Sequence, residues 1–192
     1  MLLLGQGYQQ ILDAVGDARV VLIGGGDVSN SSNADGTHGT FEFYNERALI
    51  TRALIEKLGF TAVLAEADFP DTCPINSYVL NSDKSIPVSA LDALAEFKRF
   101  PKWMWRNEVM PGFIDWLRKF NDSRTKGSEK AMFLGMDFYN MNASIHAVIQ
   151  YLEKTDSKAA AAAKKHYGCF TRFGSDDMNY AYALRFGLSK VL

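Results

Sequence analysis

Hydrophobic and polar positions along the chain follow two patterns, and together they predict alternating strands and helices. Short apolar runs at Arg19–Gly24, Thr61–Ala65 and Ala131–Met136 are typical of strands buried in a parallel sheet. Between these runs, apolar residues recur at helical spacing. Strands separated by helices predict an α/β fold in which a mainly parallel β-sheet is flanked by helices, with right-handed crossovers.

The helical stretches have recognisable ends. Gly59 is placed to end the helix that begins at Glu42, and Asp156 or Ser157 can cap the last regular helix. Residues 68–71 are expected to form a turn or the start of a helix. The expected helices lie near residues 6–15 and at Glu42–Leu58, Ser89–Lys98, Met110–Phe120, Asn140–Lys154, 157–166 and, after a loop at Phe173–Asp177, Met178–Leu188.

The number of strands bears on the extent of the domain. Three strands are few for a parallel sheet that must be covered on both faces, and no closing strand follows Leu188. We therefore expect residues 1–192 to form a single α/β domain that is the N-terminal part of a larger one, truncated at its C-terminus. The length of 192 residues fits one domain, and contents of 47% hydrophobic and 12% aromatic residues suffice for a substantial core.

Charge and cysteine content narrow the class of protein. The net charge of −1 shows no excess of basic residues of the kind that binds nucleic acid or an acidic membrane, so neither is expected as a partner. The apolar run Leu2–Leu4 is too short for a signal peptide, and no segment reaches membrane-span length. Cys73 and Cys169 match no metal or redox spacing and predict buried free thiols in a reducing compartment. The sequence thus indicates a cytoplasmic protein, with no sign of its oligomeric state.

Ionisable side chains follow all three predicted strands. His38 lies in the loop after the first strand, Glu66 and Asp68 follow the second, and Asp137 follows the third. Because ligands bind outside the carboxyl ends of parallel strands, we expect these groups to form one polar site. A neutral His38 imidazole at a helix entrance can act as a general base towards water; its structural alternative is a turn or capping role.

Arg47 and the carboxylates of the second strand form the next hypothesis. Arg47 lies on a mostly apolar helix face and needs a partner, which Glu66 or Asp68 can supply. Glu66 ends an apolar strand and is expected to be partly buried, with Asp68 pointing the same way. The arginine would orient a carboxylate or stabilise an oxyanion. The alternatives are a structural ion pair for Arg47 and a helix N-cap role for Asp68.

Two further stretches bear on ligand binding. The run Lys102–Asn107 contains Trp103, Trp105 and Arg106, which can line a pocket for a large, partly apolar molecule or anchor the edge of the core. Gly24–Asp27 invites comparison with a phosphate loop but fits neither Gly-rich template, so it indicates a flexible loop. We therefore count Trp103, Trp105 and Arg106 as candidate substrate-binding residues.

Several ordered motifs resemble the erythromycin esterase family. The matching segments are Leu22–Gly24, Thr37–Arg47, Gly59–Val63 leading to Glu66, Phe100–Asn107 and Gly135–Tyr139. The resemblance implies a metal-independent hydrolase without cofactor, in which a histidine activates water for attack on an ester or lactone carbonyl of a small molecule. His38 matches that base, and Arg47 and Glu66 match the supporting arginine and glutamate. Asp137, in the last segment, joins the candidate substrate-binding residues.

The chain departs from the family pattern in two places. Asp35 stands where the family has a glutamate three residues before the histidine, and the segment Gly25–Ala34 is inserted after the first strand. Asp35 is a shorter, auxiliary candidate for the catalytic set, and a misplacement of about 1 Å can lower a rate by about 10²-fold. Family members are also longer, and neither His146 nor His166 matches their second catalytic histidine. The comparison implies an incomplete site with weak or no turnover.

Two alternatives to the hydrolase stay open. A non-catalytic module derived from the same fold can keep the pocket, bind a small molecule or depend on a partner, and lack the chemistry. The altered first motif and the missing second histidine favour this alternative. The other is metal-assisted hydrolysis through His38, Glu66 and Asp137.

Overall fold

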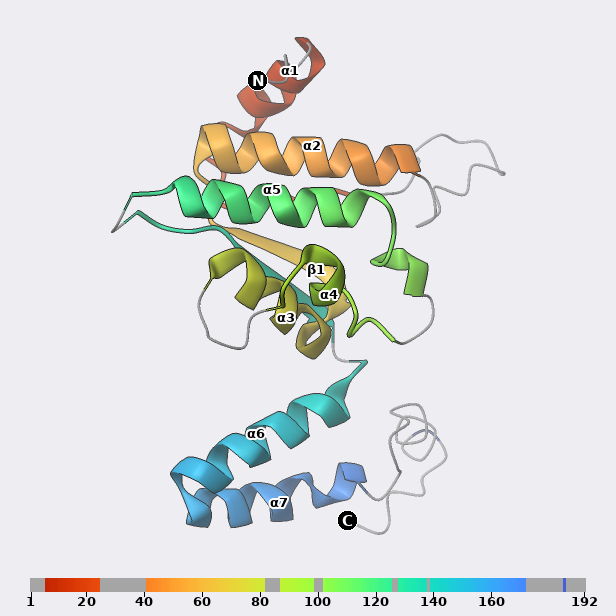
Figure 1. Ribbon diagram of the computed structural model, residues 1–192, viewed down its shortest axis with the longest axis vertical. Coiled ribbons are helices and arrows are strands. Elements are labelled where there is room, and N and C mark those ends of the chain that lie inside the picture. The colour runs from red at the N-terminus through yellow and green to blue at the C-terminus, as the bar shows by residue number, and fades with distance from the viewer. Residues whose placement is uncertain are drawn as a thin grey trace. The chain divides into compact units, whose positions relative to one another are not determined.

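The computed structural model describes residues 6–24, 41–81, 87–98, 102–125, 128–137, 139–171 and 185 (Figure 1). Within these residues most of the chain is helical, and two strands pair in a small parallel sheet. The helices flank this sheet, which confirms the predicted class, an incomplete α/β domain. The elements are α1 (Gln6–Val15), α2 (Phe41–Leu58), β1 (Ala62–Asp68), α3 (Phe69–Leu80), α4 (Ala90–Ala93), the 3-10 turn η1 (Lys102–Met104), α5 (Val109–Ser123), β2 (Met132–Asp137), α6 (Met141–Thr155) and α7 (Ser157–Thr171).

The second and third predicted strands are confirmed, and the first is wrong. Strands β1 and β2 follow the predicted apolar runs and end at the predicted carboxylates, Asp68 and Asp137. Arg19–Gly24, in contrast, has no strand structure. The sheet of the described residues therefore has the order β1-β2 and no third member.

The apolar run Arg19–Gly24 is not a buried strand, because two of its apolar side chains are exposed and the other two are only half-buried. Val20 is 76% exposed and Leu22 is 92% exposed, although both lie in the apolar run. A strand needs backbone hydrogen bonds to a neighbouring strand, and no described segment pairs with this run in that way. The other two apolar residues pack on a small core between α1 and α2: Val21 and Ile23 pack against Leu12, Ala53 and Leu54.

Helical spacing located most of the helices, and their ends follow the expected capping. Gly59 adopts a left-handed φ of +72° directly after α2, as its predicted role at the end of this helix requires. Asp156 caps α7, because its Oδ1 accepts hydrogen bonds from the backbone N–H groups of Lys158 and Ala159, each at 3.0 Å. The predicted helix 89–98 is wrong in length, since only α4 forms there, after the N-cap Ser89.

Helix α3 is longer than the turn or helix start expected at residues 68–71. Its sequence contains prolines and turn-forming residues, which argue against a helix of 12 residues. Pro70 falls in the first turn, where a missing backbone N–H breaks no helical hydrogen bond, and Pro74 lies inside the helix. Two other predicted segments, Phe173–Asp177 and Met178–Leu188, lie outside the described residues except for residue 185.

The chain forms two compact units. The first unit consists of Met1–Ala65 and Asp71–Leu134, and the second of Glu66–Pro70 and Gly135–Leu192. In the second unit α6 and α7 pack as a helical hairpin, with Ile145 and Ala160 buried (Figure 1). Organisation as a single domain stays a prediction.

The core of the first unit is rich in aromatic side chains. Helices α2 and α5 lie side by side (Figure 1), and α5 buries residues at helical spacing. The buried set on α5 is Met110, Phe113, Ile114, Leu117 and Asn121. Phe133 of β2 is 2% exposed, and its ring lies 6.3 Å from that of Phe113 and 6.2 Å from that of Trp105. Strand β2 is thus joined to α5 and to the segment after η1 by edge-to-face ring contacts.

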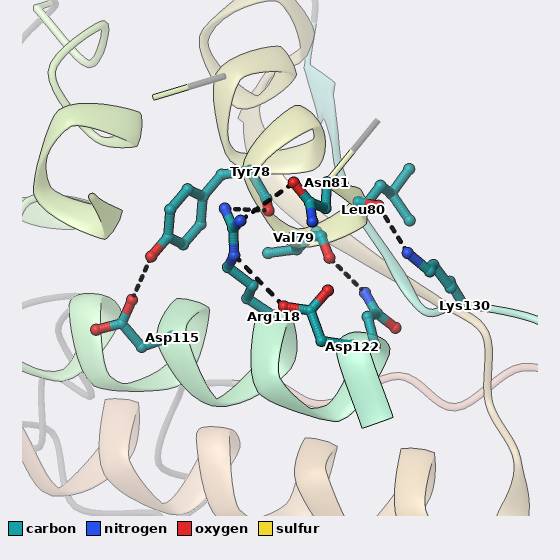
Figure 2. Close-up of polar contacts among 9 residues, drawn as sticks. Tyr78, Val79, Leu80, Asn81, Asp115, Arg118, Asp122 and Lys130 are labelled. Carbon is teal, nitrogen blue, oxygen red and sulfur yellow. Dashed lines mark hydrogen bonds and ion pairs between the residues drawn. The ribbon is translucent and has the colours of Figure 1, made fainter. Parts of the chain in front are cut away.

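The C-terminus of α3 is capped by side chains from distant parts of the chain (Figure 2). The helix is followed by Asn81, which has a left-handed φ of +52°. The last backbone carbonyls of a helix have no partner within the helix, and positive charge near them is favourable. The donors come from α5 and the segment just before β2: Arg118 to Tyr78 O at 3.1 Å, Asn121 to Val79 O at 2.9 Å and Lys130 to Leu80 O at 2.9 Å.

Tyr78 makes this junction sensitive to alkaline pH. Its hydroxyl donates a hydrogen bond to Asp115 at 2.9 Å, and burial, followed by this hydrogen bond, raises the pKa of Tyr78 above its usual value of 10.0. Because the folded-state pKa is raised, the stabilisation is fully present below pH 10 and is lost as pH rises through the folded-state value. We expect the free energy of unfolding in urea to fall more steeply above pH 10 in the wild type than in Tyr78→Phe. Tyr151→Phe, at an exposed position, should show the same pH dependence of the free energy of unfolding as the wild type. Equal pH dependence in all three proteins would show that Tyr78 does not cause the loss of stability above pH 10.

Two remaining observations concern the cysteines and membrane segments. Cys73 is a free thiol, but the prediction that it is buried is wrong, because α3 leaves it exposed. Partial desolvation and the Asp71 carboxylate raise the pKa of this thiol. Among the described helices, none is both long and apolar enough to span a bilayer.

Candidate functional site

The carboxyl ends of β1 and β2 carry the acidic side chains that the sequence placed there. Glu66 is exposed, Asp137 is half-buried and Asp68 is only 4% exposed. The expectation that Glu66 is partly buried is wrong, because it continues the exposed face of β1 formed by Ala62 and Leu64. Asp68 does not share that environment, since the strand ends there and α3 begins with the next residue.

Gly135 lets the backbones of the two strands come close together at this end. A Cβ atom added to Gly135 would lie 2.4 Å from the carbonyl oxygen of Ala67 and 2.8 Å from that of Asp68. Both neighbours are backbone atoms, so a side chain at this position would force the strands apart. Only glycine therefore fits where β2 approaches the last residues of β1.

Asp68 ties the end of β1 to the start of α6. Its Oδ1 accepts a hydrogen bond from the backbone N–H of Asn140 at 3.0 Å, and Asn140 is the N-cap of α6. A carboxylate near a helix N-terminus is also stabilised by the helix dipole. Asp68 thus fixes the turn that follows Asp137, and the second unit carries this connection entirely within itself.

We expect Asp68→Ala to loosen the turn between β2 and α6. The substitution removes the Asp68 acceptor of the Asn140 N–H, a part-buried hydrogen bond of the kind that contributes about 0.5–1.5 kcal/mol. Hydrogen–deuterium exchange should become faster around residues 139–142, whereas Asp68→Asn, which keeps an oxygen acceptor, should retain more protection. Glu66→Ala, on the exposed face of the same strand, is the matched control. Unchanged exchange in Asp68→Ala would show that this hydrogen bond does not hold the turn.

Arg47 lies in the first unit and makes local contacts on α2. Its Nε donates a hydrogen bond to the backbone carbonyl of Phe43 at 3.2 Å, and its guanidinium carbon lies 4.5 Å from the centre of the Tyr44 ring. Glu66 and Asp68 belong to the second unit. Pairing of Arg47 with either carboxylate stays a prediction.

The predicted substrate-binding residues of the Lys102–Asn107 run occupy different surroundings. Trp103, in η1, is 47% exposed, and Arg106 is exposed as well. Trp105 is half-buried, and its ring contacts those of Tyr44, Phe97 and Phe133. Trp105 therefore anchors the edge of the core, which was the alternative to a role in ligand binding. Trp103 and Arg106 are accessible to a ligand.

Asn107 has a structural role that the sequence analysis did not assign. Its Oδ1 accepts hydrogen bonds from the backbone N–H groups of Val109 at 3.0 Å and Met110 at 3.2 Å, and its Nδ2 donates to Met104 O at 3.1 Å. It therefore caps the first turn of α5 and fixes η1 to that helix. An asparagine two residues before an apolar periodic run was the signal that predicts such a cap.

Two catalytic candidates, His38 and Asp35, lie outside the described residues. Their predicted roles stay predictions, and so does a metal site formed by His38, Glu66 and Asp137. Among the residues that the structure describes, no group of three or more His, Cys, Asp and Glu side chains is arranged to hold a metal ion.

Fold and site together define an α/β protein with acidic side chains at the carboxyl ends of paired parallel strands. The chain belongs to the erythromycin esterase family, a hydrolase-type family whose sequence pattern matches residues 55–192. It is similar to erythromycin esterase type II of Escherichia coli, with 28% identity over 130 residues. These residues are 68% of this chain and 26% of that enzyme, so the match spans about a quarter of the relative's length.

Two crystal structures are similar to the chain in fold. One is described as a succinoglycan biosynthesis protein and has a TM-score of 0.68 at 18% identity, covering 91% of this chain and 39% of the other. The second is a protein from Bacillus cereus with a TM-score of 0.56 at 22% identity, covering 74% and 32% of the two chains. At such identities the likeness concerns the fold alone.

Proposed function

We propose that the chain is an esterase-type hydrolase domain that acts on an ester or lactone of a small molecule. His38 would take a proton from water as the water oxygen attacks the substrate carbonyl, with Arg47 and Glu66 as the supporting charged residues. Asp35 is an auxiliary carboxylate, and Trp103, Trp105, Arg106 and Asp137 are the candidate residues around the substrate. The sequence-based prediction of a cytoplasmic protein without cofactor is part of this proposal.

The observation that carries the proposal is the family match, because it includes the strand ends at which the acidic side chains lie. Attack of water on a carbonyl creates a tetrahedral oxyanion, and a fixed cation stabilises it more than it stabilises the neutral substrate. Collapse of this intermediate releases the alcohol and the carboxylic acid. For a lactone, both groups stay on one opened chain, so the product gains the mass of one water.

Hydrolysis by the purified chain tests the proposal. We expect slow, enzyme-dependent turnover of 4-nitrophenyl acetate or of a macrocyclic lactone such as erythromycin, detected as nitrophenolate or by mass spectrometry as the gain of one water. Activity below that of the E. coli esterase is expected, because Asp35 and the inserted segment alter the first motif. Rates equal to those of heat-denatured protein with every ester and lactone tried would reject the hydrolase.

A non-catalytic binding module is the second candidate, and the altered first motif is the observation that favours it. Such a module would bind erythromycin or a related lactone in calorimetry without converting it. Binding would be unaffected by His38→Ala and lost in Trp105→Ala. Because Trp105 also packs among core rings, Trp103→Ala is the cleaner variant, since that side chain is exposed.

A further inference from the structure

A row of contacting rings leads from the core of the first unit to Arg47. The Phe133 ring lies 6.2 Å from that of Trp105, and Trp105 lies 6.3 Å from that of Tyr44 in an edge-to-face arrangement. Tyr44 is 7% exposed, and the Arg47 guanidinium carbon lies 4.5 Å from its ring centre. These residues come from β2, the segment after η1, and α2, so three parts of the chain meet in this row.

We propose that Tyr44 and Trp105 are positioning residues that hold the Arg47 guanidinium for a ligand oxygen. The inference rests on the proposed function, and it changes the role predicted for Trp105 from ligand contact to support. The face of an aromatic ring attracts a cation, and this attraction strengthens when the ring is withdrawn from water, as the Tyr44 ring is. Trp105 fixes that ring from the side, because its own indole is packed against Phe97 and Phe133.

The hydrogen bonding of Arg47 fits this role. Within the described residues its hydrogen bond runs from Nε to the Phe43 carbonyl, one turn earlier on the same helix. That bond and the Tyr44 ring restrain the guanidinium, and within the part of the chain that the structure describes its two terminal amino groups make no further hydrogen bond. Paired donors of this kind match a carboxylate or a tetrahedral oxyanion.

The chain contains a matched control for this arrangement. Arg52, on the same helix, has its guanidinium carbon 5.1 Å from the centre of the Trp116 ring. Its Nη2 already donates to the backbone carbonyl of Gly112 at 3.1 Å, and the adjacent Glu56 accepts from Trp116 Nε1 at 3.2 Å. This cation–ring pair joins α2 to α5 and is not part of the proposed site.

Arginine side-chain NMR tests the proposal independently of activity. In the wild-type chain we expect nuclear Overhauser contacts between Arg47 side-chain protons and the Tyr44 ring, and a ring-current shift of the Arg47 Nε–H signal. Tyr44→Leu should abolish that shift, Tyr44→Phe should keep it, and Trp105→Leu should reduce it. Trp116→Leu should move the Arg52 signal and leave that of Arg47 in place, and an unchanged Arg52 signal in Tyr44→Leu shows that this variant is folded.

Hydrolysis provides the second readout. We expect kcat to fall roughly tenfold in Tyr44→Leu with little change in KM, because a contact made in the transition state is weakened, and Tyr44→Phe should restore most of it. An Arg47 signal without Tyr44 contacts in the wild-type chain overturns the proposal, whether or not the variants fold. If the contacts between Arg47 and Tyr44 are present but the chain hydrolyses no ester, the proposed function is rejected and the positioning of Arg47 is retained.

Discussion

Replacing His38 with alanine is expected to lower the rate of ester hydrolysis by about 10²–10⁴-fold, the usual contribution of a positioned general base. Without the imidazole, the proton of the attacking water must pass to solvent as the new carbon–oxygen bond forms. The loss should appear in kcat and in kcat/KM, because a base acts in the transition state and contributes little to binding of the substrate. Initial rates of 4-nitrophenyl acetate hydrolysis over a range of concentrations measure both constants.

The pH profile gives this prediction a second test. A general base must be neutral, so kcat/KM of the wild type should rise with pH as the imidazole loses its proton. The profile of His38→Ala should lack that rise. His146→Ala is the matched control, because His146 is exposed on α6 and should leave both the rate and the profile unchanged. Equal rates above that of heat-denatured protein for the wild type and His38→Ala would remove His38 from the mechanism.

The sequence predicted elements whose burial repeats in a regular way and missed those defined by distant contacts. Helix α5 shows this most clearly, because Met110, Phe113, Ile114 and Leu117 follow a spacing that can be counted along the chain and are all buried. An apolar run becomes a strand only when a neighbour supplies its hydrogen bonds, and for Arg19–Gly24 the described chain supplies none. The length of α3 depends on donors about 40 residues away, at Arg118 and Asn121, which local propensity does not report.

The candidate site shows the same division. The sequence predicted that Glu66, Asp68 and Asp137 lie at strand ends, because each follows an apolar run of strand length. The exposed fraction of each carboxylate could not be predicted from the sequence. It depends on the residue at which β1 ends and on how closely Gly135 of β2 approaches the backbone of β1. Asp68 shows this most clearly, because its partner, the Asn140 N–H, lies 72 residues further along the chain.

Asn121 is expected to give the largest loss of stability of any single polar substitution in the first unit. It is 0% exposed, and its side chain joins α5, α3 and the segment just before β2. Nδ2 donates to Val79 O and to Ala131 O, each at 2.9 Å, and Oδ1 accepts from the Ala131 N–H at 2.8 Å. Three backbone groups therefore depend on one amide side chain, and none of them has water as an alternative at this depth.

Asn121→Ala should lower the free energy of unfolding by about 3 kcal/mol or more, because each buried backbone group left unpaired costs about 1–3 kcal/mol. A loss of this size is a large part of the 5–15 kcal/mol that stabilises an ordinary domain. Urea unfolding followed by circular dichroism measures it. The adjacent Asp122→Ala is the control, because its carboxylate is 44% exposed and its 3.6 Å ion pair with Arg118 is worth less than about 1 kcal/mol. Similar losses for the two variants would mean that the buried amide of Asn121 does not couple α3 to the segment before β2.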